Sequence, residues 1–432
     1  MTEYKVRPFV NPIRAQVEVP GSKSMTNRAL FMAAMAKETT LLKGVLFSDD
    51  SRFFLSSLQS LGFAVQIDEE KKEVVIHGTG GNIPNKEPEI YVGSAGTAAR
   101  FLTAFLALND VNGVIHCSEQ MAKRPMKALF DALTSLGAEF EWLGEKDHLP
   151  VRVRGKKQDV KAEVNIDISK STQFLSALMM SGPLFEEGLT ITVTSDKKTG
   201  SYVRITQMMM EQFGCQVTFD GNRYLVLPHS SYECKEYQIE PDVSAADYFY
   251  AMALLTGSAI LVKNVYFDSM QGDIKLLDVF RQMGCDVREE EAGIRVTGRT
   301  DTQYEAVTVD MNDFSDQTMT LAAVAAYLKG VTRICNVGHI RGQESNRMLA
   351  IVTELNKVGI ECFEDGDDLV IRGGIPKAAA MDTYEDHRMA MAFSLLGLRT
   401  EGIVIKDPLC CRKTFENYFA VLDSLIDISR GE

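Results

Sequence analysis

The chain contains 432 residues, of which 45% are hydrophobic and 24% are charged, and its net charge is −13. This composition is typical of a folded globular protein and excludes a chain that is disordered throughout. The length suits two domains of roughly 200 residues each. The negative charge argues against general nucleic-acid binding, because a polyanion needs a basic surface.

At the start of the chain, the segment MTEYKVRPFV has none of the features of a signal peptide. Further along, no apolar stretch is long enough to span a membrane without a polar interruption. We therefore expect a cytoplasmic enzyme with no membrane partner. No His, Cys or carboxylate residues have the spacing of metal ligands, so we expect no metal and no cofactor. The eight cysteines form no CxxC pair, which favours buried free thiols over disulfides.

Six times along the chain, a short polar or charged segment precedes a run of small apolar residues, which predicts six buried helices. The helix starts lie near Lys23, Gly96, Ser171, Ala245, Asp316 and His387. Neighbouring starts are 71 to 75 residues apart, as between 245 and 316 or between 96 and 171. A repeat of this length indicates one structural unit used six times.

A second series of helices is amphipathic, and each of these helices ends at a glycine. The glycines are Gly62, Gly137, Gly214, Gly284 and Gly359. Glycine ends a helix well because it adopts positive φ without strain. Alternating apolar and polar residues follow and predict two strands, with Asp220-Gly221 and Asp365-Gly366 as hairpin turns.

Each unit is thus expected to run strand, buried helix, strand, surface helix, strand, strand. The predicted fold class is α/β, with helices inside and sheets outside. After the last surface helix, predicted over 419–428, the chain ends without two further strands, and we expect the segment 6–21 to supply them. The predicted domains are 22–239 and 1–21 with 240–432, and the cleft between them is the expected ligand site.

The helix starts concentrate cations on an otherwise acidic chain. These cations are Lys23, Arg28, Arg100, Arg124, Arg347, Arg388 and Lys413. Because helix N-termini also attract anions, the convergence predicts a site for one or two small molecules with several negative groups. An ordinary cap or a solvated charge remains the alternative for each start taken alone.

Several of these motifs have a simple structural interpretation. Ser24 and Asp316 could each cap a helix. Glu344 and Arg347 could form an i, i+3 ion pair on one helix face. We expect Pro125 in a first helical turn, where it would aim the preceding arginine at the helix start.

Nine segments, taken in chain order, resemble the 5-enolpyruvylshikimate-3-phosphate synthase family: PGSKSMTNRAL, GSAGTAAR, KRPMKALFDAL, STQFLSALM, SYVRIT, DFSDQTMTLA, RGQESNRM, YEDHRMAM and DPLCCRKTF. The resemblance covers nearly the whole chain. It implies two inside-out α/β-prism domains of three repeats each. It also implies transfer of the enolpyruvyl group of phosphoenolpyruvate to the 5-hydroxyl of shikimate 3-phosphate, on the shikimate pathway to chorismate and the aromatic amino acids. The resemblance gives phosphoenolpyruvate and shikimate 3-phosphate as the partners, and we expect a monomer.

The resemblance also implies roles for individual residues. Asp316 would be the general base for the 5-hydroxyl, Glu344 would protonate the methylene carbon, and Lys23 would act with them. The residues expected to bind shikimate 3-phosphate are Lys23, Ser24, Arg28, Ser171, Thr172, Gln173, Thr199, Tyr202, Asp316, His339 and Gln343. Those expected to bind phosphoenolpyruvate are Lys23, Ser94, Gly96, Arg124, Gln173, Arg347, His387, Arg388 and Lys413.

Some positions depart from the pattern of the family. Ser94 and His339 stand where asparagine is usual, Phe101 where proline is common, and Gln343 where a lysine usually lies. We therefore expect the absence of that lysine to change substrate affinity or pH dependence. By spacing, Thr199 takes the place of a family serine, which the nearby Ser201 could also fill.

Two other functions are weighed against this interpretation. UDP-N-acetylglucosamine enolpyruvyl transferases share the fold and chemistry, but they use a loop cysteine shortly before an Arg-Pro pair. In this chain Cys117 lies seven residues before Arg124, at a predicted strand end. A non-catalytic repeat scaffold would leave the charged helix starts unexplained.

Overall fold

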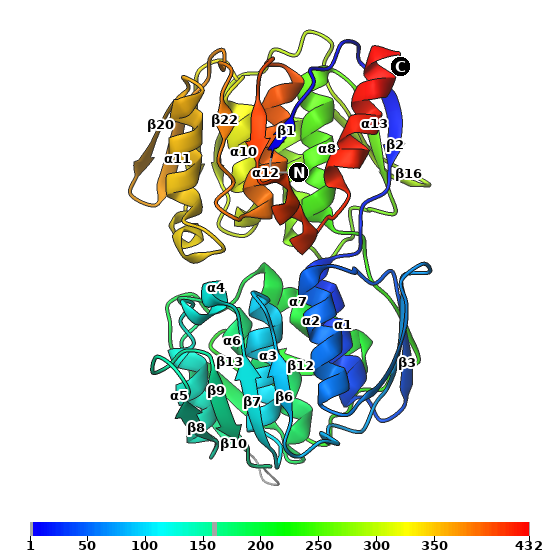
Figure 1. Cartoon of the computed structure of the whole chain (residues 1–432), viewed down its shortest axis with the longest axis vertical. Coiled ribbons are helices and arrows are strands. Elements are labelled where there is room, and N and C mark those ends of the chain that lie inside the picture. Colours follow the sequence, from blue (N-terminus) through cyan, green and yellow to red (C-terminus); the bar gives the residue numbers. More distant parts are fainter. Residues whose placement is uncertain (1–2, 158–161, 432) are drawn as a thin grey trace. The chain divides into compact units, whose positions relative to one another are not determined.

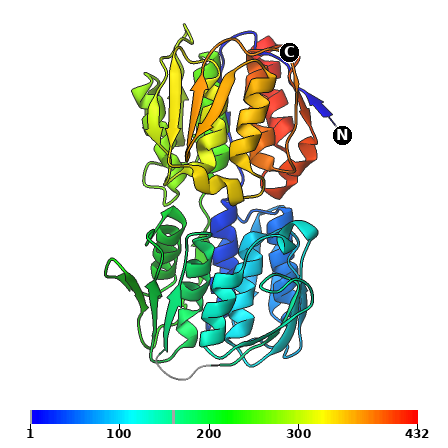
Figure 2. The same cartoon turned by 90° about the vertical axis from the view of Figure 1, so that its left-hand side faces the viewer.

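The computed structural model describes residues 3–157 and 162–431. Its contacts divide the chain into two compact units. One is the uninterrupted segment Gly21–Glu240, called the continuous unit below. The other combines Met1–Pro20 with Pro241–Glu432 and is called the composite unit. Within each unit, helices are flanked by sheets of short strands (Figures 1 and 2).

Two repeats of the continuous unit show the predicted order of elements directly. One runs β6 (Glu89–Tyr91), α3 (Gly96–Ala107), β7 (Asn112–His116), α4 (Glu119–Ala122), α5 (Lys127–Ser135), β8 (Glu139–Trp142) and β9 (Val151–Arg154). The next runs β10 (Ala162–Ile166), α6 (Gln173–Ser181), η1 (Gly182–Leu184), β11 (Leu189–Val193), α7 (Ser201–Gln212), β12 (Val217–Phe219) and β13 (Arg223–Val226). In both sheets the first strand pairs parallel with the second, and the later strands pair antiparallel.

The remaining repeat of the continuous unit takes its first strand from the far end of that unit. Its elements are α1 (Lys23–Met35), β3 (Thr39–Lys43), α2 (Asp49–Ser60), β4 (Ala64–Asp68) and β5 (Glu73–His77). The strand β14 (Glu236–Gln238) completes this sheet by pairing parallel with β3. The continuous unit therefore contains three complete four-stranded sheets among its described residues.

The composite unit contains the other three repeats. The fourth comprises α8 (Val243–Thr256), β15 (Ala259–Lys263), η2 (Gly272–Lys275), α9 (Leu276–Gln282), β16 (Asp286–Glu290) and β17 (Gly293–Thr297). The fifth comprises β18 (Thr308–Asp310), η3 (Ser315–Gln317), α10 (Thr318–Ala325), β19 (Val331–Cys335), η4 (Gly338–Gly342), α11 (Arg347–Lys357), β20 (Glu361–Asp365) and β21 (Asp368–Arg372). The sixth comprises β22 (Ala380–Met381), α12 (His387–Ser394), η5 (Leu395–Leu398), β23 (Val404–Lys406), η6 (Pro408–Lys413) and α13 (Tyr418–Arg430).

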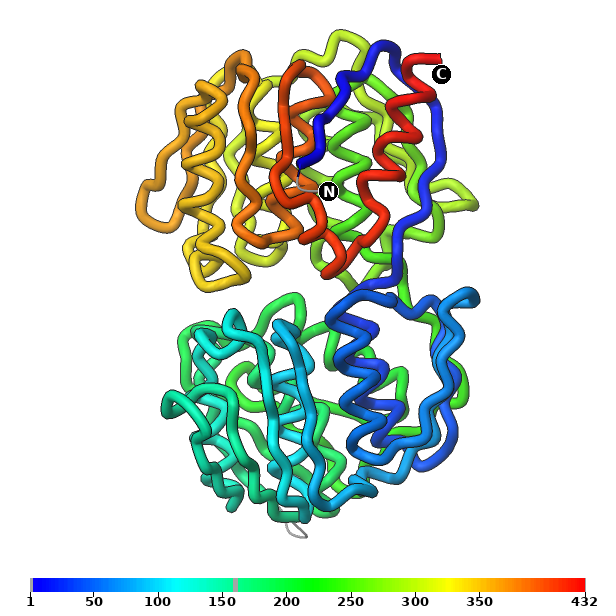
Figure 3. The backbone as a smooth tube through the Cα atoms, in the orientation of Figure 1, coloured from blue at the N-terminus to red at the C-terminus, as the bar shows by residue number. Residues whose placement is uncertain are grey.

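The N-terminal segment completes two different sheets of the composite unit. Strand β1 (Glu3–Lys5) pairs antiparallel with β23, and β2 (Arg14–Val17) pairs parallel with β15. The prediction that 6–21 supplies both missing strands of the sixth repeat is therefore wrong. The sixth sheet gains only β1 and remains three-stranded, whereas β2 covers an edge of the fourth sheet that would otherwise be open. Near β1, the Tyr4 hydroxyl donates to Asp423 of α13 at 2.8 Å, and Figure 3 shows the segment running beside this helix.

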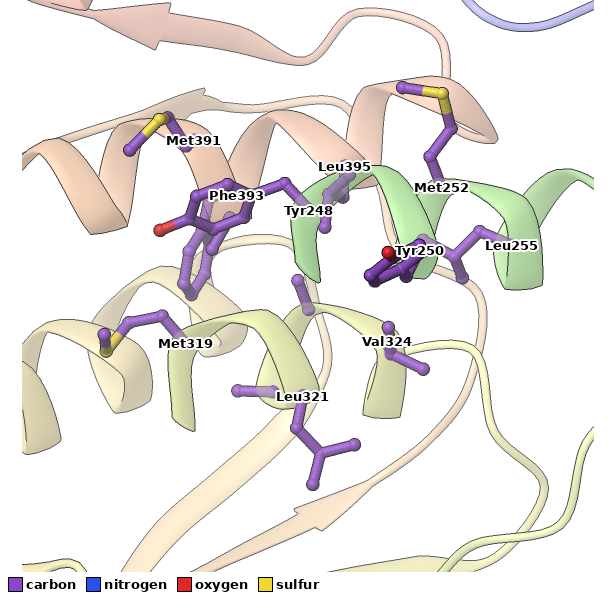
Figure 4. Close-up of a cluster of buried hydrophobic side chains, with 14 of the residues drawn as sticks. Tyr248, Tyr250, Met252, Leu255, Met319, Leu321, Val324, Met391, Phe393 and Leu395 are labelled. Carbon is purple, nitrogen blue, oxygen red and sulfur yellow. The ribbon is translucent and has the colours of Figure 1, made fainter. Parts of the chain in front are cut away.

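The predicted inside-out arrangement is confirmed by the burial of the inner helices. All residues of α3, α10 and α12 are buried, as is α8 up to Leu255. Figure 4 shows apolar side chains of α8, α10 and α12 packing against one another, among them Tyr248, Met319 and Phe393. Each fully buried side chain of this size contributes about 1.5 to 3 kcal/mol. The core of the composite unit therefore lies between its helices, with the sheets as outer walls.

The predicted helix ends and thiols are also confirmed. The five glycines that follow the amphipathic helices all have positive φ, from 82° at Gly359 to 96° at Gly284. All eight cysteines are free, and Cys215, Cys285 and Cys362 are buried. Over residues 3–157 and 162–431, no helix combines the length and the apolar character that a membrane span requires.

Candidate active site

The first helix start holds a fully buried arginine. Arg28, in the second turn of α1, is 1% exposed. Its guanidinium donates to Ser24 Oγ at 2.5 Å, to Thr206 Oγ1 at 2.8 Å and to the Tyr202 carbonyl at 3.2 Å. All these acceptors are neutral, and burial lowers the pKa of Arg28 to about 10. Because a buried charge is unfavourable without a counter-charge, this cation is suited to binding an anion.

Aromatic rings surround the same guanidinium. The ring centroids of Phe101 and Tyr202 lie 5.3 and 5.9 Å from its central carbon. Such contacts stabilise a cation over an aromatic face. Phe101, one of the departures from the family pattern, therefore packs against Arg28. Because Phe101 belongs to α3 and Tyr202 to α7, two further helices fix the arginine on α1.

A second group of cations meets at the start of α3. A Cβ atom added at Gly96 would lie 2.7 Å from Arg100 Nη1, 2.8 Å from Arg124 Nη1 and 3.5 Å from Gln173 Oε1. Arg100 donates to Gln173 Oε1 at 2.5 Å, and its guanidinium carbon lies 5.4 Å from the Phe174 ring centroid. Two guanidinium groups and an amide thus lie against a glycine at a helix N-terminus. This combination suits the close approach of a small anion.

The other predicted residues of the continuous unit lie in the turns beside these two groups. Lys23, the first residue of α1, places Nζ 3.6 Å from Asp50 of α2. Ser171 Oγ accepts from the Gln173 backbone N–H at 3.2 Å. A Cβ atom at Gly200 would lie 3.5 Å from Thr172 Cγ2, so the turn between Thr199 and α7 lies against Thr172.

Two expectations about this unit are wrong. Ser24 does not cap α1, because Ser22 is the N-cap residue and Arg28 donates to the Ser24 hydroxyl. Pro125 does not stand in a first helical turn, because α5 begins two residues later at Lys127. Ser94 is half-buried between β6 and α3.

In the composite unit, a second buried arginine collects three carboxylates. Arg347, 1% exposed, donates to Asp316 at 2.9 Å, to Glu344 at 3.0 Å and to Asp386 at 2.8 and 3.3 Å. Burial alone lowers the pKa of Arg347, but the carboxylates of Asp386, Glu344 and Asp316 outweigh it, and the net shift is upward. One guanidinium therefore holds Asp316 and Glu344, the residues predicted as base and acid.

Further cations share these carboxylates. Arg388 Nη2 donates to the second oxygen of Asp316 at 3.0 Å, and Lys413 Nζ lies 3.4 Å from the second oxygen of Glu344. Arg388 and Lys413 are each 8% exposed. The result is a dense set of three cations and three carboxylates, counting Asp386. We call these residues the carboxylate group.

The structural interpretations of Asp316 and Glu344 need correction. Asp316 lies in η3 and accepts from two arginines instead of capping α10. Glu344 forms the expected i, i+3 ion pair with Arg347 but lies outside the helix, because α11 begins at Arg347 itself with Asn346 as its cap. The pair therefore bridges a turn and a helix start.

Three other predicted residues lie near this group. His387 begins α12 and is 1% exposed, with Nδ1 3.7 Å from Asp386 Oδ1. His339 Nε2 lies 2.8 Å from the hydroxyl of Ser315, the residue before Asp316. Gln343 is exposed in the turn after η4.

Sequence reasoning missed three buried acids, one in the carboxylate group and two near it. Asp386 is fully buried and caps α12, which is how an acidic residue before an apolar helix would be interpreted from sequence. Asp247 on α8 is also fully buried, and neither carboxyl oxygen has a hydrogen-bond partner among the described residues. Burial and then Asp273 raise the pKa of Asp247 well above its usual value. Burial and the Asp316 carboxylate raise the pKa of Asp273 to about 6.

No group of three or more His, Cys, Asp or Glu side chains within residues 3–157 and 162–431 has the geometry to hold a metal ion. The side chains brought together at the helix starts are cations, hydroxyls, amides and carboxylates. They can bind anionic groups and move protons.

Comparison with known proteins gives one family throughout. The family model described as EPSP synthase (3-phosphoshikimate 1-carboxyvinyltransferase) matches residues 9–422. A relative from Trichormus variabilis, named 3-phosphoshikimate 1-carboxyvinyltransferase, is 40% identical over 409 residues, which are 94% of this chain and 95% of the relative. A Vibrio campbellii relative of the same name is 38% identical over 421 residues, covering 96% and 98%. The solved EPSP synthase of Acinetobacter baumannii has a TM-score of 0.83 over 98% of each chain at 24% identity, which supports the fold.

Proposed function

Because the chain belongs to the EPSP synthase (3-phosphoshikimate 1-carboxyvinyltransferase) family, we propose that it transfers the enolpyruvyl group of phosphoenolpyruvate to the 5-hydroxyl of shikimate 3-phosphate and releases phosphate. The observation that carries the proposal is the arrangement around Arg347. One buried guanidinium holds the carboxylates of Asp316 and Glu344 at 2.9 and 3.0 Å. The reaction needs one group to remove a proton and another to deliver one.

In the addition step, Asp316 takes the proton of the 5-hydroxyl while the hydroxyl oxygen bonds to C2 of phosphoenolpyruvate. Glu344 delivers a proton to the methylene carbon, which gives a tetrahedral intermediate. In the elimination step, the bond between C2 and the phosphate oxygen breaks, and the methyl group returns a proton to the Glu344 carboxylate, which restores the double bond. Arg347 orients both carboxylates, since it donates to each.

The cations of both units are proposed to bind the substrates' negative groups. Arg347, Arg388 and Lys413 would serve the phosphate and carboxylate of phosphoenolpyruvate, with Arg124 and Gly96. Preorganised cations stabilise charge that moves during such a reaction. His387, at the start of α12 beside Asp386, would bind phosphoenolpyruvate with them.

On the other substrate, the buried Arg28 and its hydroxyl partners would bind shikimate 3-phosphate. Ser171, Thr172 and Tyr202 would contact it from the starts of α6 and α7, and Gln173 would lie between the two ligands. Hydroxyls and a cation with no buried carboxylate partner suit a phosphate-bearing ligand. We further propose that the continuous and composite units are the two domains of the enzyme, with the substrates contacting residues of both.

The test combines the purified chain with both substrates and follows phosphate release and product formation. The chain should turn over shikimate 3-phosphate but not UDP-N-acetylglucosamine. Asp316→Ala should reduce kcat by about 10²- to 10⁴-fold, the usual contribution of a positioned general base. Asp313→Ala is the matched control, because Asp313 pairs with Lys275 on the surface and should leave kcat near that of the wild type. Undiminished turnover in Asp316→Ala would remove Asp316 from its assigned role.

A further inference from the structure

The turn that leads into α12 contains two successive residues in an unfavourable backbone conformation. Tyr384 and Glu385 both have φ of 56°, although neither is glycine. A side chain in this left-handed region is strained, because its Cβ lies too close to the following carbonyl oxygen. Such a conformation persists only where surrounding contacts hold it, and it occurs preferentially at functional sites. The contacts that hold this turn are therefore informative.

A buried carboxylate on the neighbouring helix α11 holds the turn. Glu354 is 0% exposed and accepts from the Tyr384 hydroxyl at 2.7 Å and from the Asp382 backbone N–H at 3.0 Å. Lys357 donates to both Glu354 oxygens at 2.9 and 2.7 Å, and to Asp382 at 2.7 Å. Lys406 of β23 donates to the other oxygen of Asp382 at 2.9 Å. Two carboxylates and two ammonium groups thus neutralise one another, and they fasten the start of the turn to α11.

The residue that follows the strained pair is Asp386. Its Oδ2 accepts from Arg347 Nε at 2.8 Å and from the Ser345 hydroxyl at 3.0 Å, and its Oδ1 accepts from the backbone N–H of Arg388 at 3.0 Å. Arg347 begins α11, and Glu354 lies seven residues further on, or about two helical turns. Helix α11 therefore grips the turn at both ends, through Glu354 before the strained pair and through Arg347 after it.

We propose that Tyr384 and Glu354 form a positioning latch, which keeps the 382–386 turn in its strained form and thereby places Asp386, Arg347 and Arg388 for the reaction. The inference rests on the proposed function and adds two residues that touch neither substrate. Without the Tyr384 hydroxyl bond, the strained turn loses a contact to a buried carboxylate. Asp386 then shifts, and with it the two arginines that hold Asp316.

The Tyr384 hydroxyl offers a clean test, because the residue is 40% exposed and its loss leaves no cavity in the core. Tyr384→Phe removes the hydroxyl, and with it the hydrogen bond to Glu354, but keeps the aromatic ring. The matched control is Tyr327→Phe, which removes a tyrosine hydroxyl bonded to the Leu396 carbonyl and to Thr400 elsewhere in the composite unit. Each variant is assayed for kcat and for KM of both substrates, and its thermal unfolding is measured.

Tyr384→Phe should lower kcat/KM for phosphoenolpyruvate by about tenfold or more, because small displacements of catalytic groups reduce rates strongly. In Tyr327→Phe, kcat/KM should stay within about twofold of the wild type, although its Tm should change about as much as that of Tyr384→Phe. Adding Glu385→Gly to Tyr384→Phe should restore most of the activity, because glycine adopts positive φ without strain and lets the turn keep its shape.

Equal activities of the two tyrosine variants would overturn the latch. So would a loss in Tyr384→Phe that simply follows a lower Tm and is not restored by Glu385→Gly. Wild-type turnover in the same assay separates the two proposals. A wild type that transfers no enolpyruvyl group refutes the proposed function, and the role of the latch with it. A normal wild type beside an unaffected Tyr384→Phe refutes the latch alone.

Discussion

Two buried arginines of this protein have opposite surroundings. Arg28 donates to neutral hydroxyls and carbonyls, whereas Arg347 donates to three carboxylates. The charge of Arg347 is thus compensated within its own unit, whereas among the described residues no carboxylate accepts from Arg28. A buried charge is destabilising without a partner. An anion bound at Arg28 supplies that partner and should therefore stabilise the folded protein.

The effect of ligand on unfolding tests this difference. Shikimate 3-phosphate at about 100 times its Kd should stabilise the wild type by roughly 2.7 kcal/mol and raise Tm by several degrees. Arg28→Met should abolish most of that rise, as followed by differential scanning fluorimetry. The control is Arg52→Met on α2, which removes a surface ion pair with Glu69 and should leave the ligand-induced rise in Tm intact. An equal rise in Arg28→Met would contradict the assignment of Arg28 to this ligand.

Asp273 gives a pH dependence with an unusual sign. Burial and the Asp316 carboxylate raise its pKa to about 6, from 3.8 in the unfolded chain. Between roughly pH 4 and 6 the folded state therefore binds more protons than the unfolded state, and this group makes stability fall as pH rises. The change in the pKa of Asp273 from 3.8 to about 6 stabilises the folded state by on the order of 3 kcal/mol below pH 4. This stabilisation is fully lost above pH 6.

Asp273→Asn should remove this effect, since an amide oxygen can still accept from the Ser244 hydroxyl, as the carboxylate does. The variant should be more stable than the wild type at pH 8, by up to about 3 kcal/mol, and the difference should shrink toward pH 4.5. Urea denaturation at both pH values measures it. Asp278→Asn, an exposed carboxylate on α9, is the control. A variant less stable than the wild type at pH 8 would show that charged Asp273 stabilises the fold.

Among the elements, the N-terminal segment packs very closely against the composite core at Gly397. A Cβ atom at Gly397 in η5 would lie 2.3 Å from Val6 Cβ and 2.5 Å from Val6 Cγ1. Since neither atom is a flexible chain end, the segment that follows β1 would have to move. Glycine at this position is therefore required by space.

Gly397→Ala should cost about 1 to 3 kcal/mol of stability, the usual range for overpacking. Gly342→Ala is the control, because a Cβ atom there meets nothing within 4 Å. Chemical denaturation of both variants compares them. Similar stabilities would mean that the N-terminal segment adjusts without loss.

For the whole molecule, the two units differ in how the chain builds them. The continuous unit has its three sheets and its core within one uninterrupted segment, whereas the composite unit needs strands from both ends of the chain. Residues 21–240 expressed alone should therefore fold, with one cooperative thermal transition and α/β circular dichroism. Residues 241–432 alone should be aggregation-prone, because two sheet edges lose β1 and β2. A 21–240 fragment without a cooperative transition would contradict this view of the fold.

A further prediction for the whole molecule concerns ligand order. The candidate residues for shikimate 3-phosphate lie mainly in the continuous unit, and those for phosphoenolpyruvate include Arg347, Arg388 and Lys413 of the composite unit. We expect phosphoenolpyruvate to bind more tightly once shikimate 3-phosphate is present. Calorimetric titrations with and without shikimate 3-phosphate measure the coupling, and equal affinities would contradict it.

Much of the fold could be predicted, because its signals are local and repeated. Helix stops such as Gly214 recur at a steady interval, and the apolar helices identify the core. The pairing of β1 with β23 and of β2 with β15 could not be predicted, because β1 and β2 are only three and four residues long. Their partner strands lie more than 200 residues away. Asp386 was missed because its position before an apolar helix is already explained by capping of α12. Its bond to Arg347 joins residues 39 positions apart, which no local sequence pattern reveals. The roles assigned to the site residues stay predictions until the variants are assayed.

The pairing of β1 with β23 also affects the order in which the protein can fold during its synthesis. On the ribosome, β1 emerges before β23 but can pair with it only after some four hundred further residues, which takes roughly 20 to 80 seconds at about 5 to 20 residues per second. By then Gly21–Glu240 has all its strands. Until then β1 lacks its partner strand, and Pro8, Pro12 and Pro20 in the same N-terminal segment limit premature sheet formation.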